Sequence, residues 1–429
     1  MDTDPARGLA SGAVDAAGDS SGESLPRVLI VGGGVAGLEA AAALAELAPG
    51  LARVSLLTPD PDFVYKPLIV DEPFGGEPAP RYELAPLLEG LGADLVAGSL
   101  ERVDADAHEV VTADGARLGY EKLIVCVGGA PRPAYPDVVT FWSRFAGLQA
   151  DELIAAGAAL PAAGLTLVVP PGVTWPLPIY EVALMLRRRA VELGEGDLRM
   201  TLLTAEDAPL GVFGRKAIDA ISETLAARGI EVRAGVHVVA DEGVADSSLV
   251  GVPLPRSGPV VALPVIDGPR IEGLPADRGG FLPIDVHCAV TGVADVYAAG
   301  DGTSFPVKQG GIATQEADAA AEQIAASLGA PVEPSPFRPV LRGKLFTGAE
   351  SLSMRSAIAG GEGEGAISPD PLWWPPAKIA GRYLSNLLSG RDQGADLEPG
   401  GGRPLDVEVS WPHEWHGDPG LPGVDGERG

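Results

Sequence analysis

The hydrophobic pattern alternates between two kinds of segment from about residue 25 to residue 330. Short apolar runs such as Arg27–Val31 and Leu165–Val169 predict buried strands, and longer Ala/Leu-rich stretches such as Val35–Leu47 predict helices. Strands that alternate with helices are typical of parallel α/β sheets. The same alternation predicts strands Arg53–Leu57, Lys122–Val127, Arg199–Thr204, Ile230–Arg233 and Val293–Ala299, and helices Ile179–Leu193, Arg215–Arg228 and Gly311–Leu328.

Composition narrows the class of protein. A chain of 429 residues is too long for one ordinary core, and 46% hydrophobic with 21% charged residues is normal for a globular protein. The formal net charge of −28 argues against nucleic acid as a partner and against a bare anionic membrane surface. Two cysteines cannot form a multi-bridge framework, so the sequence predicts a reducing cytoplasm.

Both ends of the chain differ from its body. Residues 1–24 are rich in Ala, Gly, Ser and Asp and lack apolar periodicity, so they are predicted to be disordered. Residues 389–429 form an acidic, Gly- and Pro-rich tail in which Trp411 and Trp415 are the large anchors. The pattern therefore places the folded body between the two ends.

The strongest chemical motif lies in residues 28–39 (VLIVGGGVAGLE). Gly32, Gly34 and Gly37 fill the G-x-G-x-x-G pattern between a predicted strand and a predicted helix. The first glycine permits a tight turn, the second lets backbone approach a pyrophosphate, and the third lets helix pack on strand. The alternative is a glycine-rich turn without a ligand. One departure is that the next strand ends at Thr58 rather than at an acid, so a hydroxyl would replace the usual ribose-binding carboxylate.

Two later segments share a strand-turn pattern. Residues 295–301 (DVYAAGD) end a strand with Ala-Gly-Asp, and residues 122–132 (KLIVCVGGAPR) end one with Gly-Gly. With the glycine pattern before them, these segments resemble the FAD-linked pyridine-nucleotide/disulfide oxidoreductase superfamily. The resemblance implies that Asp301 accepts a hydrogen bond from the ribityl chain of FAD, and that the following helix points its N-terminus at the flavin ring.

The resemblance implies a two-domain organisation. We expect an α/β fold with two Rossmann-like dinucleotide-binding domains and a C-terminal region. The FAD domain would be discontinuous (residues 25–150 and 276–330). The second domain would span residues 151–275 with a degenerate nucleotide loop, and residues 331–388 would form an interface region.

Two further stretches narrow the resemblance to sulfide:quinone oxidoreductases and type II NADH dehydrogenases. They are residues 57–68 (LTPDPDFVYKPL) and 306–313 (PVKQGGIA). The likeness implies that Lys308 pairs with the flavin or with a quinone oxygen, where a cation stabilises the reduced ring; the alternative is a solvent lysine. The complete set of expected cofactor-binding residues is Gly32, Gly33, Gly34, Val35, Ala36, Gly37, Thr58, Lys66, Val127, Gly128, Gly129, Gly300, Asp301, Lys308, Gln309 and Gly310.

The second domain lacks the glycine pattern. Residues 170–181 (PPGVTWPLPIYE) keep one glycine, and prolines remove N–H donors. Trp175 and Leu177 would fill the space that a pyrophosphate needs, so we expect weak NADH binding. The resemblance to sulfide:quinone oxidoreductases implies a redox cysteine in this turn, and the matching position here is Trp175. We interpret Cys126 and Cys288 as structural thiols. Glu181 is the second candidate catalytic residue, as a proton acceptor beside the flavin or, alternatively, an acid that complements the helix dipole.

The C-terminal region predicts a strand pair over 337–348 and a helix over 377–388. Ile379, Tyr383, Leu384 and Leu388 share one apolar face of that helix, and Trp373 and Trp374 precede it. Two interpretations stay open: a peripheral contact at the inner face of the membrane, or a dimer or flavin-domain contact. The five histidines show no metal-binding spacing.

These features predict an FAD-dependent oxidoreductase that passes electrons from a small-molecule donor to a quinone or similar acceptor. Two alternatives remain. One is a flavin-bound, non-enzymatic partner-binding module, since both familiar electron-entry sites are altered. The other is an enzyme like the type II NADH dehydrogenases.

Overall fold

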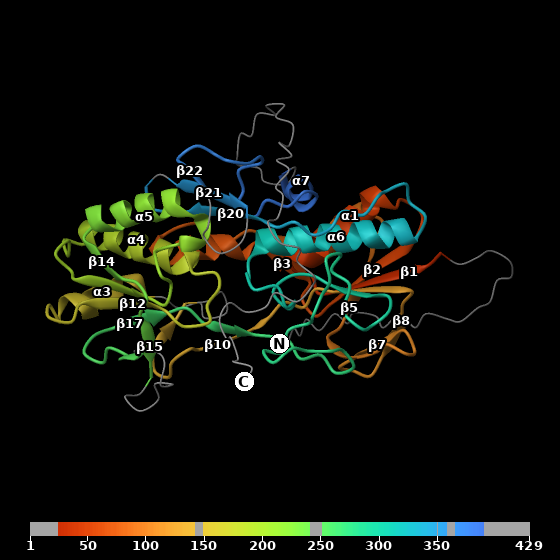
Figure 1. The fold of residues 1–429 in the computed structure, drawn as a ribbon, viewed down its shortest axis with the longest axis horizontal. Coiled ribbons are helices and arrows are strands. Elements are labelled where there is room, and N and C mark those ends of the chain that lie inside the picture. The colour runs from red at the N-terminus through yellow and green to blue at the C-terminus, as the bar shows by residue number, and fades with distance from the viewer. Residues whose placement is uncertain (1–24, 142–148, 241–250, 350, 358–364, 390–429) are drawn as a thin grey trace, which may run out of the picture.

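The computed structural model describes residues 25–141, 149–240, 251–349, 351–357 and 365–389. Figure 1 shows an elongated molecule with one parallel sheet in each half and a small C-terminal sheet above the junction. No helix within these ranges is both long and apolar enough to cross a bilayer.

The first sheet contains five parallel strands in the order β19-β9-β1-β2-β5. The central position of β1 follows from its burial, since Val28 and Ile30 are fully buried, as expected for a strand covered on both faces. One strand, β19, comes from far along the chain, so this sheet is built from two separate parts of the sequence. The bounds are β1 Arg27–Val31, β2 Arg53–Thr58, β5 Asp94–Ala97, β9 Lys122–Val125 and β19 Val296–Ala298.

Two helices lie together over this sheet (Figure 1). Helix α1 (Val35–Leu47) is buried almost all round, because its alanines let α6 (Gly310–Ser327) approach closely on one side and the sheet on the other. Smaller elements complete this half: η1 Lys66–Phe74, α2 Leu84–Gly90, the strand pair β3 Asp62–Val64 and β4 Arg81–Glu83, and the antiparallel sheet β6 Leu100–Asp104, β7 Glu109–Thr112 and β8 Arg117–Gly119.

The second sheet is also parallel, with the order β11-β17-β12-β13-β14. Its first strand precedes residue 150, so the chain reaches this sheet earlier than the expected domain limit. The strands are β11 Val139–Thr140, β12 Leu165–Val169, β13 Met200–Thr204, β14 Ile230–Arg233 and β17 Val260–Ala262. The other elements are α3 Ala150–Ala158, α4 Leu177–Glu192, η2 Gly211–Phe213, α5 Arg215–Ala227, and the strand pairs β10 Ala130–Arg132 with β18 Val265–Asp267 and β15 His237–Val239 with β16 Gly251–Pro253.

The C-terminal sheet corrects one prediction. Residues 337–348 hold a single strand, β20 (Val340–Leu345), and its partner is the next segment, β21 (Leu352–Ala357), which pairs in turn with β22 (Ala366–Ser368). Two glutamines, one in α6 and one directly before it, hold β20 in place. Gln315 bonds both backbone groups of Val340, and Gln309 donates to the carbonyl oxygen of Arg342. These bonds position β20 against α6.

The predicted helix over 377–388 is wrong for its first two turns, because α7 spans Leu384–Ser389 alone. The Glu39 carboxylate of α1 accepts hydrogen bonds from the backbone N–H groups of Tyr383 and Leu384, at 2.8 and 2.6 Å, and so fixes where the helix begins. Ile379, Tyr383, Leu384 and Leu388 are buried inside the protein. The apolar face on which the membrane and dimer interpretations depended therefore packs on the chain's own first half.

Candidate functional site

The carboxyl ends of three strands of the first sheet meet at one edge. A Cβ placed on Gly32, after β1, would lie 2.3 Å from the carbonyl oxygen of Cys126, after β9. A Cβ on Gly129 would lie 3.2 Å from the carbonyl oxygen of Asp301, and one on Gly300 would lie 3.4 Å from Cβ of Ala36. Parallel strands place their carboxyl ends together, and these turns pack so tightly that glycine is required.

The first turn of α1 faces open space. A Cβ on Gly37 would lie 1.9 Å from the carbonyl oxygen of Gly32, so this glycine permits the close packing of helix on strand. A Cβ on Gly34 would lie within 4 Å of no atom in the described ranges. No side chain caps the helix start, and no acid lies in the first turn. The free N–H groups and the positive end of the helix dipole therefore fit a pyrophosphate.

Asp301 supplies a second test of the cofactor. Among the residues that the structure describes, none donates a hydrogen bond to its carboxylate. Burial raises the pKa of Asp301, and Lys308 and Lys66 oppose that rise. Asp301 is only half-buried, so its carboxylate is free to accept hydrogen bonds, and an acceptor beside open glycine turns fits the hydroxyl groups of a dinucleotide cofactor. Gly128, whose added Cβ would also meet no described atom, leaves room beside it.

Thr58 lies where the sequence predicts it. Its side chain is buried, its hydroxyl accepts a hydrogen bond from Asp60 N at 3.3 Å, and its oxygen would lie 3.1 Å from a Cβ on Gly33. The structure thus gathers most of the expected cofactor residues at one edge: Gly32, Gly33, Gly34, Val35, Ala36, Gly37, Thr58, Val127, Gly128, Gly129, Gly300 and Asp301.

Lys308 is half-buried and its ammonium group is occupied. It donates to the carbonyl oxygens of Thr303 and Phe305, at 2.5 and 2.6 Å, and lies 3.9 Å from the centre of the Phe281 ring. Burial lowers the pKa of Lys308 to about 8, against the opposing effects of Glu316, Asp301 and Asp277. The side chain therefore braces the loop between β19 and α6, and its charge interacts with Asp301.

Glu316 is a site residue that the sequence reasoning missed. It is fully buried on α6 and accepts hydrogen bonds from Gly300 N at 2.5 Å and from the Thr303 hydroxyl at 2.8 Å. Burial raises its pKa to about 8. The signal in the sequence is an acid on the face of α6 that is otherwise made of small apolar residues. Glu316 locks the Ala-Gly-Asp turn onto the helix.

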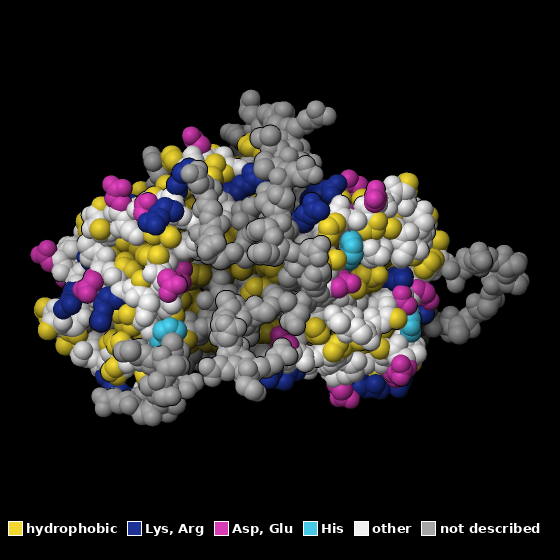
Figure 2. All heavy atoms as spheres, in the orientation of Figure 1, with side chains coloured by type: hydrophobic (Ala, Val, Ile, Leu, Met, Phe, Trp, Pro, Cys, Tyr) yellow, Lys and Arg dark blue, Asp and Glu magenta, His cyan; other side chains and the backbone are white. Residues whose placement is uncertain are grey.

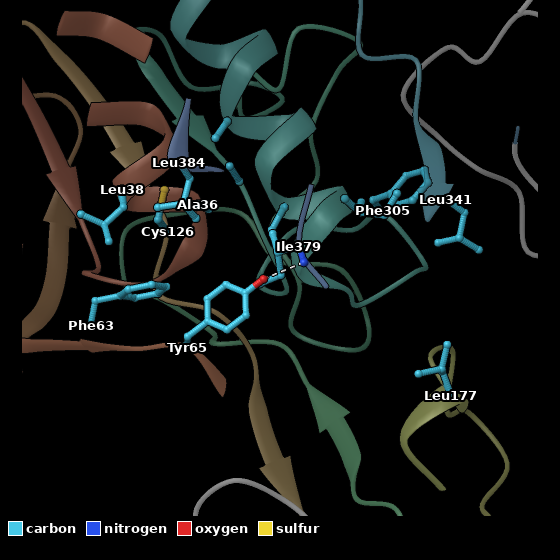
Figure 3. Close-up of a cluster of buried hydrophobic side chains, with 14 of the residues drawn as sticks. Ala36, Leu38, Phe63, Tyr65, Cys126, Leu177, Phe305, Leu341, Ile379 and Leu384 are labelled. Carbon is cyan, nitrogen blue, oxygen red and sulfur yellow. Dashed lines mark hydrogen bonds between the residues drawn. The ribbon is translucent and has the colours of Figure 1, made fainter. Parts of the chain in front are cut away.

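Gln309 and Gly310, the other two expected contacts at the start of α6, meet protein groups. The side-chain Oε1 of Gln309 caps the helix by accepting from Ile312 N at 2.9 Å. A Cβ on Gly310 would lie 2.7 Å from Cδ1 of Ile379. Figure 3 shows Tyr65 pointing at Ile379, whose N–H donates to the Tyr65 hydroxyl at 2.8 Å. The C-terminal segment thus covers the start of α6.

Glu181 forms a buried ion pair rather than standing free. Both of its carboxylate oxygens accept from Nζ of Lys378, at 2.7 and 2.8 Å, and one also accepts from Phe346 N at 2.8 Å. The two side chains are 1% and 7% exposed, so the pair is almost fully desolvated. Burial raises the pKa of Glu181, and Lys378 opposes that rise. Lys378 also donates to Pro67 O at 3.2 Å, so the pair joins α4, η1 and the C-terminal segment.

The turn after β12 is partly occupied by the protein itself, although a Cβ on Gly172 would meet no described atom. Trp175 packs edge-on against Phe213, with ring centres 5.9 Å apart, and Cδ1 of Leu177 would lie 2.9 Å from a Cβ on Gly343. Pro176 and Pro178 remove two N–H groups from the start of α4. The first turn of α4 therefore offers few donors to a phosphate.

The acid at the end of β13 is also engaged. Glu206 accepts from the Tyr180 hydroxyl at 2.6 Å and from the Thr204 hydroxyl at 2.8 Å. This is the position from which a ribose-binding acid would act in a nucleotide-binding domain of this type. In the second domain, Trp175 and Glu206 are therefore both engaged by other groups of the chain.

Cys126 and Cys288 are free, buried thiols. Burial raises the pKa of each well above its usual value, and the nearby Glu316 carboxylate adds to the rise. A thiol that stays protonated is a poor nucleophile. Both cysteines therefore have the surroundings expected of structural residues.

Comparisons with known proteins agree with this geometry. An NADH dehydrogenase-like protein of Mycobacterium tuberculosis is 30% identical over 302 residues, covering 65% of this chain and 72% of its own. The sulfide-quinone reductase of Aquifex aeolicus is 28% identical over 231 residues, covering 50% of this chain and 52% of its own. The structure of the sulfide:quinone oxidoreductase from that bacterium superposes with a TM-score of 0.68 at 21% identity, over 80% of this chain and 86% of the other.

The profile of the pyridine nucleotide-disulphide oxidoreductases matches residues 26–323, which include both parallel sheets and the glycine turns described above. The chain belongs to this family and is a flavin-dependent oxidoreductase.

Proposed function

We propose that this protein binds FAD at the edge formed by β1, β9 and β19 and passes electrons from a small-molecule donor to a quinone or similar acceptor. The observation that carries the proposal is the open space at Gly34 beside the unpartnered Asp301 carboxylate, at the start of an uncapped helix. A pyrophosphate and a polyhydroxy chain would satisfy both features at once.

Each residue at this edge has a specific task. The N–H groups at the start of α1 would hold the pyrophosphate, Thr58 the ribose, and Asp301 the ribityl chain. Glu316 fixes the Gly300 turn, and Lys308 braces the loop that follows it. When bound, the flavin supplies the electron transfer, and a nearby cation stabilises its reduced form.

Glu181 would act as a positioning residue that holds the C-terminal segment in place. Its pair with Lys378 anchors the C-terminal segment over the start of α6, so that Ile379 and Tyr65 line the covered side of the site. A proton-accepting role would require Glu181 to leave Lys378. Because burial raises its pKa while the ammonium group lowers it, loss of that contact would favour the protonated carboxyl.

The partly occupied turn after β12 argues against NADH as an efficient donor, because Trp175, Leu177 and Glu206 are all engaged by other groups of the chain. The buried thiols argue against sulfide oxidation through a cysteine disulfide. A quinone or similar acceptor is supported by the sulfide-quinone reductase among the relatives.

An anaerobic titration tests the proposal. The purified protein should be yellow, and its flavin absorbance should be followed with NADH, NADPH, sulfide and a quinol, one at a time. The expected result is a bound flavin that a quinol reduces through the reverse reaction and that micromolar NADH does not bleach rapidly. Colourless protein that cannot be reconstituted with FAD would overturn the cofactor assignment, and a flavin inert to quinol and quinone would overturn the acceptor.

A further inference from the structure

The C-terminal sheet has one apolar face and one basic face. Strand alternation places Leu341, Gly343 and Leu345 of β20 on the apolar face, which packs on Phe213 and α4. The opposite face carries Arg342 and Lys344 of β20 and Arg355 of β21. We refer to Arg342, Lys344 and Arg355 as the basic face. In Figure 2, basic side chains reach the surface at the top of the molecule, where Figure 1 labels β20 and β21.

The two arginines of the basic face lie directly opposite each other. Arg342 pairs with Arg355 in the antiparallel register, and like charges at opposed positions destabilise a sheet. Within the described ranges, neither arginine nor Lys344 forms a salt bridge, although the chain carries 59 acidic against 31 basic residues. The arrangement is therefore unfavourable unless something else compensates the charge.

The hydrogen bonds of these side chains are also incomplete. Nε of Arg342 is buried and has no hydrogen-bond partner among the described residues. Burial, with Arg355 adding to it, lowers the pKa of Arg342. Lys344 donates to Pro376 O at 3.1 Å, and burial and the nearby Lys378 lower its pKa. Glu181 neutralises Lys378 but bonds none of the three side chains of the basic face.

A bound oxyanion would compensate the opposed positive charges and accept hydrogen bonds from the unpartnered donors. Guanidinium forks bind carboxylate and phosphate groups through paired N–H donors, and such charge-assisted bonds favour the ionised form of both partners. The position is adjacent to the cofactor edge, because Gln309, at the start of α6, donates to the carbonyl oxygen of Arg342 at 3.0 Å.

We propose that Arg342, Arg355 and Lys344 form a binding site for the carboxylate or phosphate group of a small molecule. That this molecule is the electron donor or acceptor rests on the proposed function; the anion site itself does not.

Thermal unfolding of the flavin-loaded protein tests the site. Inorganic phosphate and succinate are added separately at constant ionic strength, with sodium chloride as the reference. The wild-type protein should show a saturable rise in Tm of a few degrees with one or both anions, because a ligand that binds the folded state stabilises it. Phosphate alone would indicate a phosphate ester, and succinate alone an organic acid. A rise no larger than that with sodium chloride would overturn the site.

Variants make the test specific. Arg355→Met should raise Tm without added anion, because it removes the opposed charge, and should abolish the response to anions. Arg355→Lys should keep part of the response. Arg117→Met is the matched control: Arg117 is an exposed strand arginine paired with Glu109, and its loss should leave the anion response unchanged. A lower Tm in Arg355→Met without anion, or an unchanged anion response, would overturn the proposal.

Flavin content is measured on each sample by absorbance. Wild-type protein that lacks flavin yet shows the anion response would refute the proposed function while leaving the site intact. Protein that binds flavin but shows no anion response would refute the anion site while leaving the proposed function intact.

Discussion

The turns after β1 and β12 start from the same strand-to-helix geometry and end differently. After β1, Gly34 meets no described atom and the start of α1 is uncapped. After β12, Trp175 packs on Phe213, and two prolines remove donors from the start of α4. The first turn stays open, whereas the second is partly occupied because Trp175 packs on Phe213 of η2 and Leu177 packs on Gly343 of β20.

The largest expected effect comes from filling the open turn. Gly34→Leu should abolish FAD binding, because the side chain would enter the space of the pyrophosphate while touching no described protein atom. Absorbance of the purified protein measures the loss. Gly90→Leu, at an equally open glycine that ends α2, should keep its flavin. A yellow Gly34→Leu protein would mean that the pyrophosphate lies elsewhere.

The turn after β12 predicts that NADH reduces the flavin poorly. Rapid reduction of the flavin should need about millimolar NADH. Relative to micromolar binding, this is an affinity roughly a thousandfold weaker, or about 4 kcal/mol of binding free energy. Stopped-flow bleaching of the flavin under anaerobic conditions gives the concentration dependence. Fast bleaching at micromolar NADH would remove the distinction between the two halves and favour a dehydrogenase.

The ion pair that anchors the C-terminal segment to α4 should contribute strongly to stability. Lys378→Met leaves Glu181 buried without its partner, which costs about 3 kcal/mol of unfolding free energy. The Glu181→Gln/Lys378→Met double variant should recover much of this loss. Urea denaturation followed by fluorescence measures both variants.

The same variant has a predictable pH dependence. Without Lys378, the folded-state pKa of Glu181 rises further above that of the unfolded chain, so the folded state binds the proton more tightly. Stability is then retained below the unfolded pKa and lost as pH rises through the folded pKa. The deficit of Lys378→Met should therefore grow from pH 5 to pH 8, and a deficit independent of pH would contradict this assignment.

The smallest effect is expected from the thiols. A Cys126→Ala/Cys288→Ala variant should retain its flavin and its reactivity with donors, losing in total on the order of 1–2 kcal/mol of packing. Activity and melting temperature are measured side by side. Loss of flavin reduction at unchanged stability would show that electrons enter through a cysteine.

The sequence by itself determined the first half of the site. Gly32, Gly34 and Gly37, together with the Ala-Gly-Asp turn, are local signals. Each glycine permits a backbone conformation or a close approach that is set within a few residues along the chain. The proline-rich turn after β12 was readable for the same reason, since proline acts on its own N–H group.

The tertiary structure decided which side chains contact the C-terminal segment. Nothing near residue 377 in the chain indicates that Glu39 would cap α7, that Glu181 would take Lys378, or that Tyr65 would bond Ile379. The apolar spacing over 377–388 fits a long amphipathic helix equally well, because periodicity records which residues seek burial and not what buries them. Contacts between residues hundreds of positions apart made that choice.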